Sequence, residues 1–288
     1  NIFTFTNLTQ LPKTSYSGAV IANWGPDHLA TVRKLRKLGV KNFILEKPLV
    51  DSLWHLKLLS LEKRKYNLNI SVHLQWNYSG VFEKLHDHIE SFNLGQPTSA
   101  VVFGGAKCLV MNGIHYLALT NKLFGTSPIL VSGILKSARI NPRGNNFLYY
   151  EGNLSYSYPH NKFLSMVFSN SSRISAEFFV ILERGLARLH GNILEIYRIN
   201  GDRMQADNRV VKTFPADDLI YKGDAFLFSD YSDGSDLIYR SFIAGREVKD
   251  SYIEGVEATK WLINGLKCGT KNYFSFNLFS YFRRWNIT

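Results

Sequence analysis

The stretch that decides the fold is AVIANWGPDHLATVRKLRKLGVKNFILEKPL, residues 19–49. Its apolar run at 19–22 indicates a strand, and apolar residues at helical spacing from Asp27 to Leu38 indicate a helix that ends at Gly39. A second apolar run, from Val40 to Leu45, indicates another strand. Two such strands joined by a crossover helix predict a right-handed parallel unit.

Turn residues follow both predicted strands. Asn23 to His28 follows the first, and Glu46-Lys47-Pro48 follows the second. In a parallel sheet, ligands collect at the carboxyl ends of the strands. We therefore expect the two turns to line one crevice.

Glu46-Lys47-Pro48 in this setting resembles a motif of the NAD(P)-dependent dehydrogenase family that includes glucose–fructose oxidoreductase and inositol dehydrogenase. Further similar segments are Leu94-Gly95-Gln96-Pro97, Gly104-Gly105, Gly113-Ile114-His115-Tyr116 and Leu123-Phe124-Gly125. The resemblance extends from about residue 21 to about residue 265. It implies NAD or NADP as cofactor and a sugar-like small molecule as substrate.

The chain departs from the family at its start. Such enzymes begin with a strand and a GxGxxG turn, whose glycines admit the pyrophosphate to a helix N-terminus. No GxGxxG occurs in this sequence, which begins at Asn1, and residues 1–16 resemble the helix and loop before the family's fourth strand. We expect a chain without the first half of its nucleotide-binding domain; the alternative is a domain that evolved without that half.

The expected fold class is α/β plus α+β. Residues 1–76 are predicted to form the C-terminal half of a Rossmann domain with a parallel sheet. Residues 77–288 are predicted to form a substrate-binding and oligomerisation domain, whose open, mostly antiparallel sheet is covered by helices on one face.

Periodicity places the remaining elements. Predicted helices cover 51–66, 81–92, 112–124 and 251–265, and a hinge is expected at 75–78. Short β-branched or aromatic runs predict strands at 69–74, 98–103, 147–158, 162–169, 174–182, 187–191 and 194–199. The aromatic tail at 273–285 departs from the family and has no assignment.

Two residues are candidates for the chemistry of alcohol oxidation. His115 matches the family histidine, and an imidazole near neutral pKa is a suitable base for a hydroxyl proton. Lys47 matches the family lysine, whose ammonium can bind the hydroxyl and stabilise a developing alkoxide. The alternatives are a core histidine and a surface lysine before a turn proline.

The resemblance also implies a set of cofactor contacts. Glu46 and Lys47 are expected at the nicotinamide ribose or amide, and Asn23, Trp24 and His28 beside the same end of the cofactor. Glu46 could instead be a solvated carboxylate, Trp24 a packing residue and His28 a helix start. At the hinge, Asn77 and Gly80 stand where the family has an arginine and a proline.

One substitution concerns the mechanism directly. Inositol-dehydrogenase-like relatives have an aspartate one helical turn before the histidine, where it can orient the imidazole. Met111 stands at that position here, and Asn112 could replace the acid only with another geometry. The sequence therefore leaves two functions open: a sugar, cyclitol or sugar-nucleotide oxidoreductase, and a non-catalytic relative or assembly subunit.

Composition limits the partners. A net charge of +11 could suggest nucleic acid, but the basic residues lie on helix faces (33–41 and 63–65) and no nucleic-acid-binding motif is present, so we expect none. A basic surface can instead steer an anionic sugar. No apolar run is long enough for a membrane span, and no metal-ligand spacing occurs. Two cysteines favour a reducing compartment, so we expect a cytoplasmic protein. The resemblance further implies self-association through the C-terminal sheet.

Overall fold

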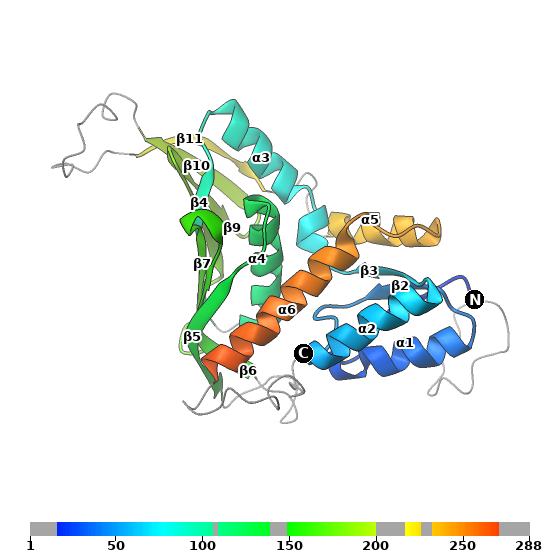
Figure 1. Cartoon of the computed structure of the whole chain (residues 1–288). Helices are drawn as coiled ribbons and strands as arrows, with labels where there is room; N and C mark the ends of the chain where they lie inside the picture. Colours follow the sequence, from blue (N-terminus) through cyan, green and yellow to red (C-terminus); the bar gives the residue numbers. More distant parts are fainter. Residues whose placement is uncertain (1–15, 106–108, 139–148, 200–216, 226–231, 271–288) are drawn as a thin grey trace.

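The structure is a computed structural model that describes residues 16–105, 109–138, 149–199, 217–225 and 232–270. Within these ranges the chain forms a short parallel sheet and a larger, mostly antiparallel sheet, with helices packed on both (Figure 1). The predicted fold class is confirmed. None of the described helices is long and apolar enough to traverse a bilayer.

The first sheet has the order β1-β2-β3. Its strands Ala19–Ile21, Asn42–Leu45 and Asn69–Val72 run parallel and are connected by α1 (His28–Lys37) and α2 (Leu53–Tyr66). These are the strands and crossover helices that the apolar pattern predicts. Strand β1 is the edge of this sheet, where Val20 is 46% exposed.

The local sequence explains both helices. In α1, the predicted apolar face of Leu29, Val32 and Leu35 is buried. In α2, the hydroxyl of Ser52 accepts a hydrogen bond from the backbone N–H of His55 at 3.1 Å, which caps a helix end that would otherwise leave amide groups unpaired.

The second sheet has the order β11-β10-β9-β8-β4-β7-β6-β5, and only the β4–β7 pair is parallel. In chain order its strands are β4 Pro97–Gly104, β5 Leu130–Ala138, β6 Tyr149–Ser157, β7 Phe163–Phe168, β8 Glu177–Leu182, β9 Gly185–His190, β10 Ile193–Ile199 and β11 Asp217–Asp224. A short 3-10 helix, η4 (Pro159–Asn161), joins β6 to β7.

Helices cover one face of this sheet, as predicted. They are α3 (Val81–Ser91), α4 (Leu109–Phe124) and α6 (Ser251–Gly269) (Figure 1). The inner side chains of the strands pack against these helices in one continuous core. The helix α5 (Ser232–Ile243) instead contacts β2 and the short 3-10 helix η3 (Gln75–Tyr78), at the predicted hinge.

Helix α6 packs against strands of both sheets. A side chain at Gly255 would meet Val72 of β3 at 2.5 Å, and one at Gly265 would meet Tyr156 of β6 at 2.5 Å. Glycine at these two positions lets one helix approach both sheets closely. The two halves of the molecule are thus tied together by a late segment of the chain.

The prediction was incomplete in three places. Strands β5 and β11 and helix α5 were not predicted. Strand β5 is an edge strand with exposed apolar residues, Leu130 at 60% and Ile134 at 75%, so it lacks the alternation of a half-buried strand. Helix α4 begins at Leu109 and α6 ends at Gly269, each longer than predicted. The helix and loop expected at residues 1–15 and the unassigned aromatic tail at 273–285 lie outside the described residues.

Candidate functional site

The carboxyl ends of the three parallel strands meet at one edge. Their last residues, Ile21, Leu45 and Val72, are in register. The backbone N–H of Glu46 donates to the Ile21 carbonyl at 2.9 Å, and that of His73 donates to the Leu45 carbonyl at 2.8 Å. The two predicted turns therefore lie at adjacent strand ends, and His73 joins them from the third strand.

His73 is at the centre of a chain of hydrogen bonds that sequence reasoning missed. Its Nδ1 lies 2.5 Å from a carboxylate oxygen of Glu46, and its Nε2 lies 2.8 Å from the hydroxyl of Ser235 on α5. We call Glu46, His73 and Ser235 the strand-end network. Ser235 is 162 residues from His73 in sequence, so no local pattern could have indicated the pair.

The pKa of Glu46 reflects two opposing effects. Burial raises it, but the hydrogen bond and charge of His73, together with the charge of Lys47, outweigh burial, so the pKa lies below its ordinary value. Glu46 is therefore ionised at neutral pH and is hydrogen-bonded to His73.

Lys47 connects the strand ends to helix α4. Its ammonium donates to the backbone carbonyl of Met111 at 2.9 Å, and its peptide bond with Pro48 is cis. Met111 is one helical turn before His115, so the ammonium lies at the turn that leads to the predicted base. The structure thus brings together the two residues predicted for catalysis, although they are 68 positions apart in the sequence.

His115 is buried in α4, with 6% of its surface exposed. Its ring stacks on that of Trp76, with 5.3 Å between centroids and 25° between planes. Among the described residues, its Nδ1 has no hydrogen-bond partner. Burial, then the positive charge of Lys47 and that of His73, hold the pKa of His115 well below 6.5. The imidazole is therefore neutral at physiological pH and can accept a proton.

The predicted contacts of the first turn have different surroundings. A short 3-10 helix, η2 (Gly25–Asp27), precedes α1. His28 is 1% exposed; its Nε2 lies 2.9 Å from the Asn23 carbonyl and its Nδ1 lies 3.1 Å from the Leu49 carbonyl. His28 thus ties the first turn to the second. The Asn23 side-chain amide donates to the Thr31 hydroxyl at 3.1 Å, and Trp24 is half-buried.

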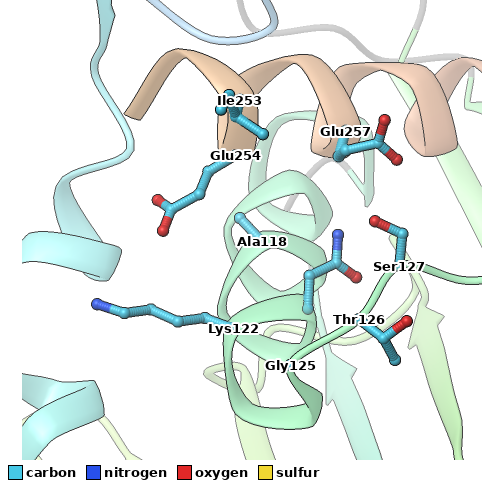
Figure 2. Close-up of a pocket in the computed structure, with 9 residues that line it drawn as sticks. Ala118, Lys122, Gly125, Thr126, Ser127, Ile253, Glu254 and Glu257 are labelled. Carbon is cyan, nitrogen blue, oxygen red and sulfur yellow. The ribbon is translucent and has the colours of Figure 1, made fainter. Parts of the chain in front are cut away.

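A separate surface hollow of about 210 Å³ lies where the C-terminal end of α4 meets α6 (Figure 2). Its walls include Lys122 and Glu254, whose side chains extend to the same side, whereas Glu257 points away from them. Lys122 donates to the Asn77 carbonyl at 2.8 Å, and Glu254 accepts from the Asn77 amide at 3.1 Å. Lys122 and Glu254 therefore both contact η3 through Asn77.

Among the described residues, no group of three or more His, Cys, Asp or Glu side chains could hold a metal ion.

No protein-family model and no curated protein sequence matches this chain. Solved structures do share its fold. UDP-N-acetylglucosamine 3-dehydrogenase GnnA from Acidithiobacillus ferrooxidans is 15% identical, with 88% of this chain and 78% of that chain covered and a TM-score of 0.65. Levoglucosan dehydrogenase in complex with NADH and levoglucosan is 13% identical, with 87% and 77% covered and a TM-score of 0.66.

A third structure with this fold is a super-repressor mutant of Gal80p from Saccharomyces cerevisiae. It is 12% identical, with 87% of this chain and 77% of that chain covered and a TM-score of 0.64. The fold of this chain is therefore the one found both in NAD-dependent sugar oxidoreductases and in Gal80p.

Proposed function

We propose that this protein is an NAD(P)-dependent oxidoreductase that transfers a hydride between a nicotinamide cofactor and a hydroxyl group of a sugar, cyclitol or sugar nucleotide. The main support is the link from Lys47 through the Met111 carbonyl to the helical turn of His115. A cation and a neutral, buried imidazole meet there at the carboxyl ends of parallel strands, where this fold class binds ligands.

The strand ends suit the nicotinamide end of such a cofactor. Asn23, Trp24, Glu46 and Lys47 would contact it, and an ionised carboxylate can accept hydrogen bonds from a ribose or a carboxamide. His28, whose two ring nitrogens already face backbone carbonyls, would support the turn under these contacts. GnnA and levoglucosan dehydrogenase, which share the fold, are a sugar-nucleotide and a sugar dehydrogenase by name.

For the pyrophosphate of the cofactor, the chain lacks the usual binding turn. The sequence has no GxGxxG turn, so backbone N–H groups of that motif are not available to a pyrophosphate. Several charge-assisted hydrogen bonds, about 1.5–3 kcal/mol each, would be lost together. We therefore predict that the 288-residue chain by itself binds NAD(H) weakly. Calorimetry is the measurement, and micromolar affinity would show that other groups of this chain bind the pyrophosphate.

The proposed mechanism assigns one task to each candidate catalytic residue. A bound nicotinamide supplies the hydride acceptor. Neutral His115 accepts the proton of the substrate hydroxyl, for which a lowered pKa keeps the acceptor form present. The Lys47 ammonium, which donates to the Met111 carbonyl, stabilises the alkoxide that develops.

We further propose that the protein is cytoplasmic and self-associates through the outer face of the second sheet. Apolar side chains are exposed on this face, namely Phe103 at 36%, Phe163 at 52%, Val167 at 44% and Ile181 at 39%. On the same face Arg188 pairs with Glu177 at 2.9 Å and Glu195 at 3.2 Å, so these charges are compensated within the sheet. A face of this kind suits a second copy of the same chain.

A non-catalytic relative or assembly subunit is the second candidate. Met111 in place of an acidic residue and the absence of GxGxxG favour it. The super-repressor mutant of Gal80p has the same fold.

The decisive experiment measures nicotinamide reduction or oxidation with a panel of sugars, cyclitols and sugar nucleotides. The Lys47→Met and His115→Ala variants serve as matched inactive forms. Turnover that both variants abolish supports the oxidoreductase. A chain that folds and assembles, but gives no turnover with any substrate or cofactor when the complete nucleotide-binding domain is present, supports the second candidate.

A further inference from the structure

His115 has no acidic side chain to orient it from the preceding helical turn. At that position Met111 offers its backbone carbonyl, which accepts from Lys47 at 2.9 Å. The buried Nδ1 of His115 has no hydrogen-bond partner among the described residues. An imidazole that is to act as a base must still be held in one plane, because a small rotation moves its nitrogens relative to the substrate. The orientation must therefore come from another contact.

The indole of Trp76 provides such a contact. It stacks on His115 with centroids 5.3 Å apart and planes 25° apart. The edge contact of the same indole with Tyr116 has 4.8 Å between centroids and 87° between planes. Trp76 thus touches two consecutive residues of α4, one with its face and one at an edge, which are the preferred geometries for aromatic pairs.

Trp76 itself is held by the hinge helix η3. The next residue, Asn77, is 1% exposed; its side-chain amide donates to Glu254 at 3.1 Å, and its carbonyl accepts from Lys122 at 2.8 Å. The hydroxyl of Tyr78 donates to Glu254 at 2.8 Å. Lys122 comes from α4 and Glu254 from α6, so two helices fix the backbone on which the indole is mounted (Figure 2).

We infer that Trp76 is a positioning residue for His115. Its indole face orients the imidazole, as a carboxylate side chain does for a catalytic histidine that has an acidic partner. The catalytic consequence of this inference rests on the proposed function, but the ring contact does not. A face contact differs from a carboxylate hydrogen bond in one important respect. It restrains the plane of the imidazole without forming a hydrogen bond to either ring nitrogen.

The test uses histidine labelled at the ring carbon between the two nitrogens, observed by NMR, with the resonance of His115 assigned by its loss in His115→Asn. Trp76→Leu removes the aromatic face and should remove the ring-current shift of this resonance. It should also move the titration of His115 toward its ordinary value, because water reaches the ring. Trp76→Phe keeps an aromatic face, so it should shift the His115 resonance by less than Trp76→Leu does. Trp54→Leu, on α2, is the matched control and should leave it unchanged.

Kinetics gives a second readout. We expect Trp76→Leu to lower kcat roughly tenfold to a hundredfold, with little change in KM for the cofactor, and Trp76→Phe to recover most of the loss. A His115 resonance that does not move in Trp76→Phe or Trp76→Leu would overturn the inference. If Trp76→Leu does not fold, the Trp76→Phe shift decides. If no substrate is ever turned over, the proposed function fails, whereas the NMR result still decides the ring contact.

Discussion

In the strand-end network, His73 has a polar partner for each ring nitrogen, Glu46 at 2.5 Å and Ser235 at 2.8 Å. In the helix region around Met111 and Trp76, the Nδ1 of His115 has none among the described residues, and an indole covers the ring. Both histidines lie close to Lys47, yet one is fixed by hydrogen bonds and the other is restrained by a face contact.

This difference indicates a structural role for His73 and a chemical role for His115. A histidine with both nitrogens engaged is well placed to hold elements together, and His73 joins β3 to the end of β2 and to α5. A buried, neutral histidine with an available nitrogen is well placed to accept a proton. Four predictions test the distinction.

The largest effect is expected at Lys47. In an active protein with a complete nucleotide-binding domain, Lys47→Met should lower turnover by orders of magnitude, since stabilisation of an alkoxide supplies several kcal/mol in the transition state. Cofactor affinity should change much less. Steady-state kinetics is the measurement, and Lys37→Met, on the exposed side of α1, is the control. Unchanged turnover would remove Lys47 from the mechanism.

Next in size is the loss of the proposed base. His115→Ala should lower turnover about 10²–10⁴-fold and remove the limb of the pH–rate profile that reports the imidazole. His73→Asn should keep that limb, because His73 is assigned to the strand-end network. If this limb of the pH–rate profile persists in His115→Ala and disappears in His73→Asn, His73 is the base and His115 is the structural histidine.

A smaller effect concerns the strand-end network. Glu46→Gln removes a charge-assisted hydrogen bond and should lower the free energy of unfolding by about 1.5–3 kcal/mol at neutral pH. Because the folded pKa of Glu46 is lowered, its stabilisation is present above the unfolded value of 4.5 and is lost as pH falls through the folded pKa. Denaturant unfolding of both forms at several pH values measures this.

For comparison, Ser235→Ala removes only the neutral partner of His73. It should therefore lower the free energy of unfolding by less, about 0.5–1.5 kcal/mol. Equal losses in Glu46→Gln and Ser235→Ala would mean that the charge of Glu46 contributes nothing.

The smallest effect is the pH dependence of stability due to His115. Its folded pKa lies well below 6.5, so below that pH the unfolded chain takes up a proton that the folded chain does not, and stability falls. The wild type should lose about 1 kcal/mol more than His115→Asn between pH 6.5 and about pH 5.5. Parallel curves for the two forms would show that His115 is not shielded from protons.

Local pattern was sufficient for much of this molecule. The apolar periodicity of residues 19–45 predicted β1, α1 and β2. The central strand β2 is buried from Phe43 to Leu45, as a nearly continuous apolar run indicates. The Glu-Lys-Pro turn and the Gly-Ile-His-Tyr segment indicated Lys47 and His115 by resemblance. Strand β5 and helix α5 were not predicted. Strand β5 is an edge strand without clear apolar alternation, and α5 begins with Ser-Asp-Gly-Ser-Asp, residues that are typical of a turn.

The amino-acid pattern alone was sufficient for most of the helices and strands and for the residue types at the ends of the parallel strands, because these depend on neighbours a few positions away. Which side chains contact one another depends instead on tertiary packing. The contact of Lys47 with the Met111 carbonyl spans 64 positions, and that of His73 with Ser235 spans 162. The stack of Trp76 on His115 likewise depends on how α6 and α4 hold the hinge. Such pairs form because helices from later in the chain pack beside the first sheet and η3, and no local periodicity encodes that packing.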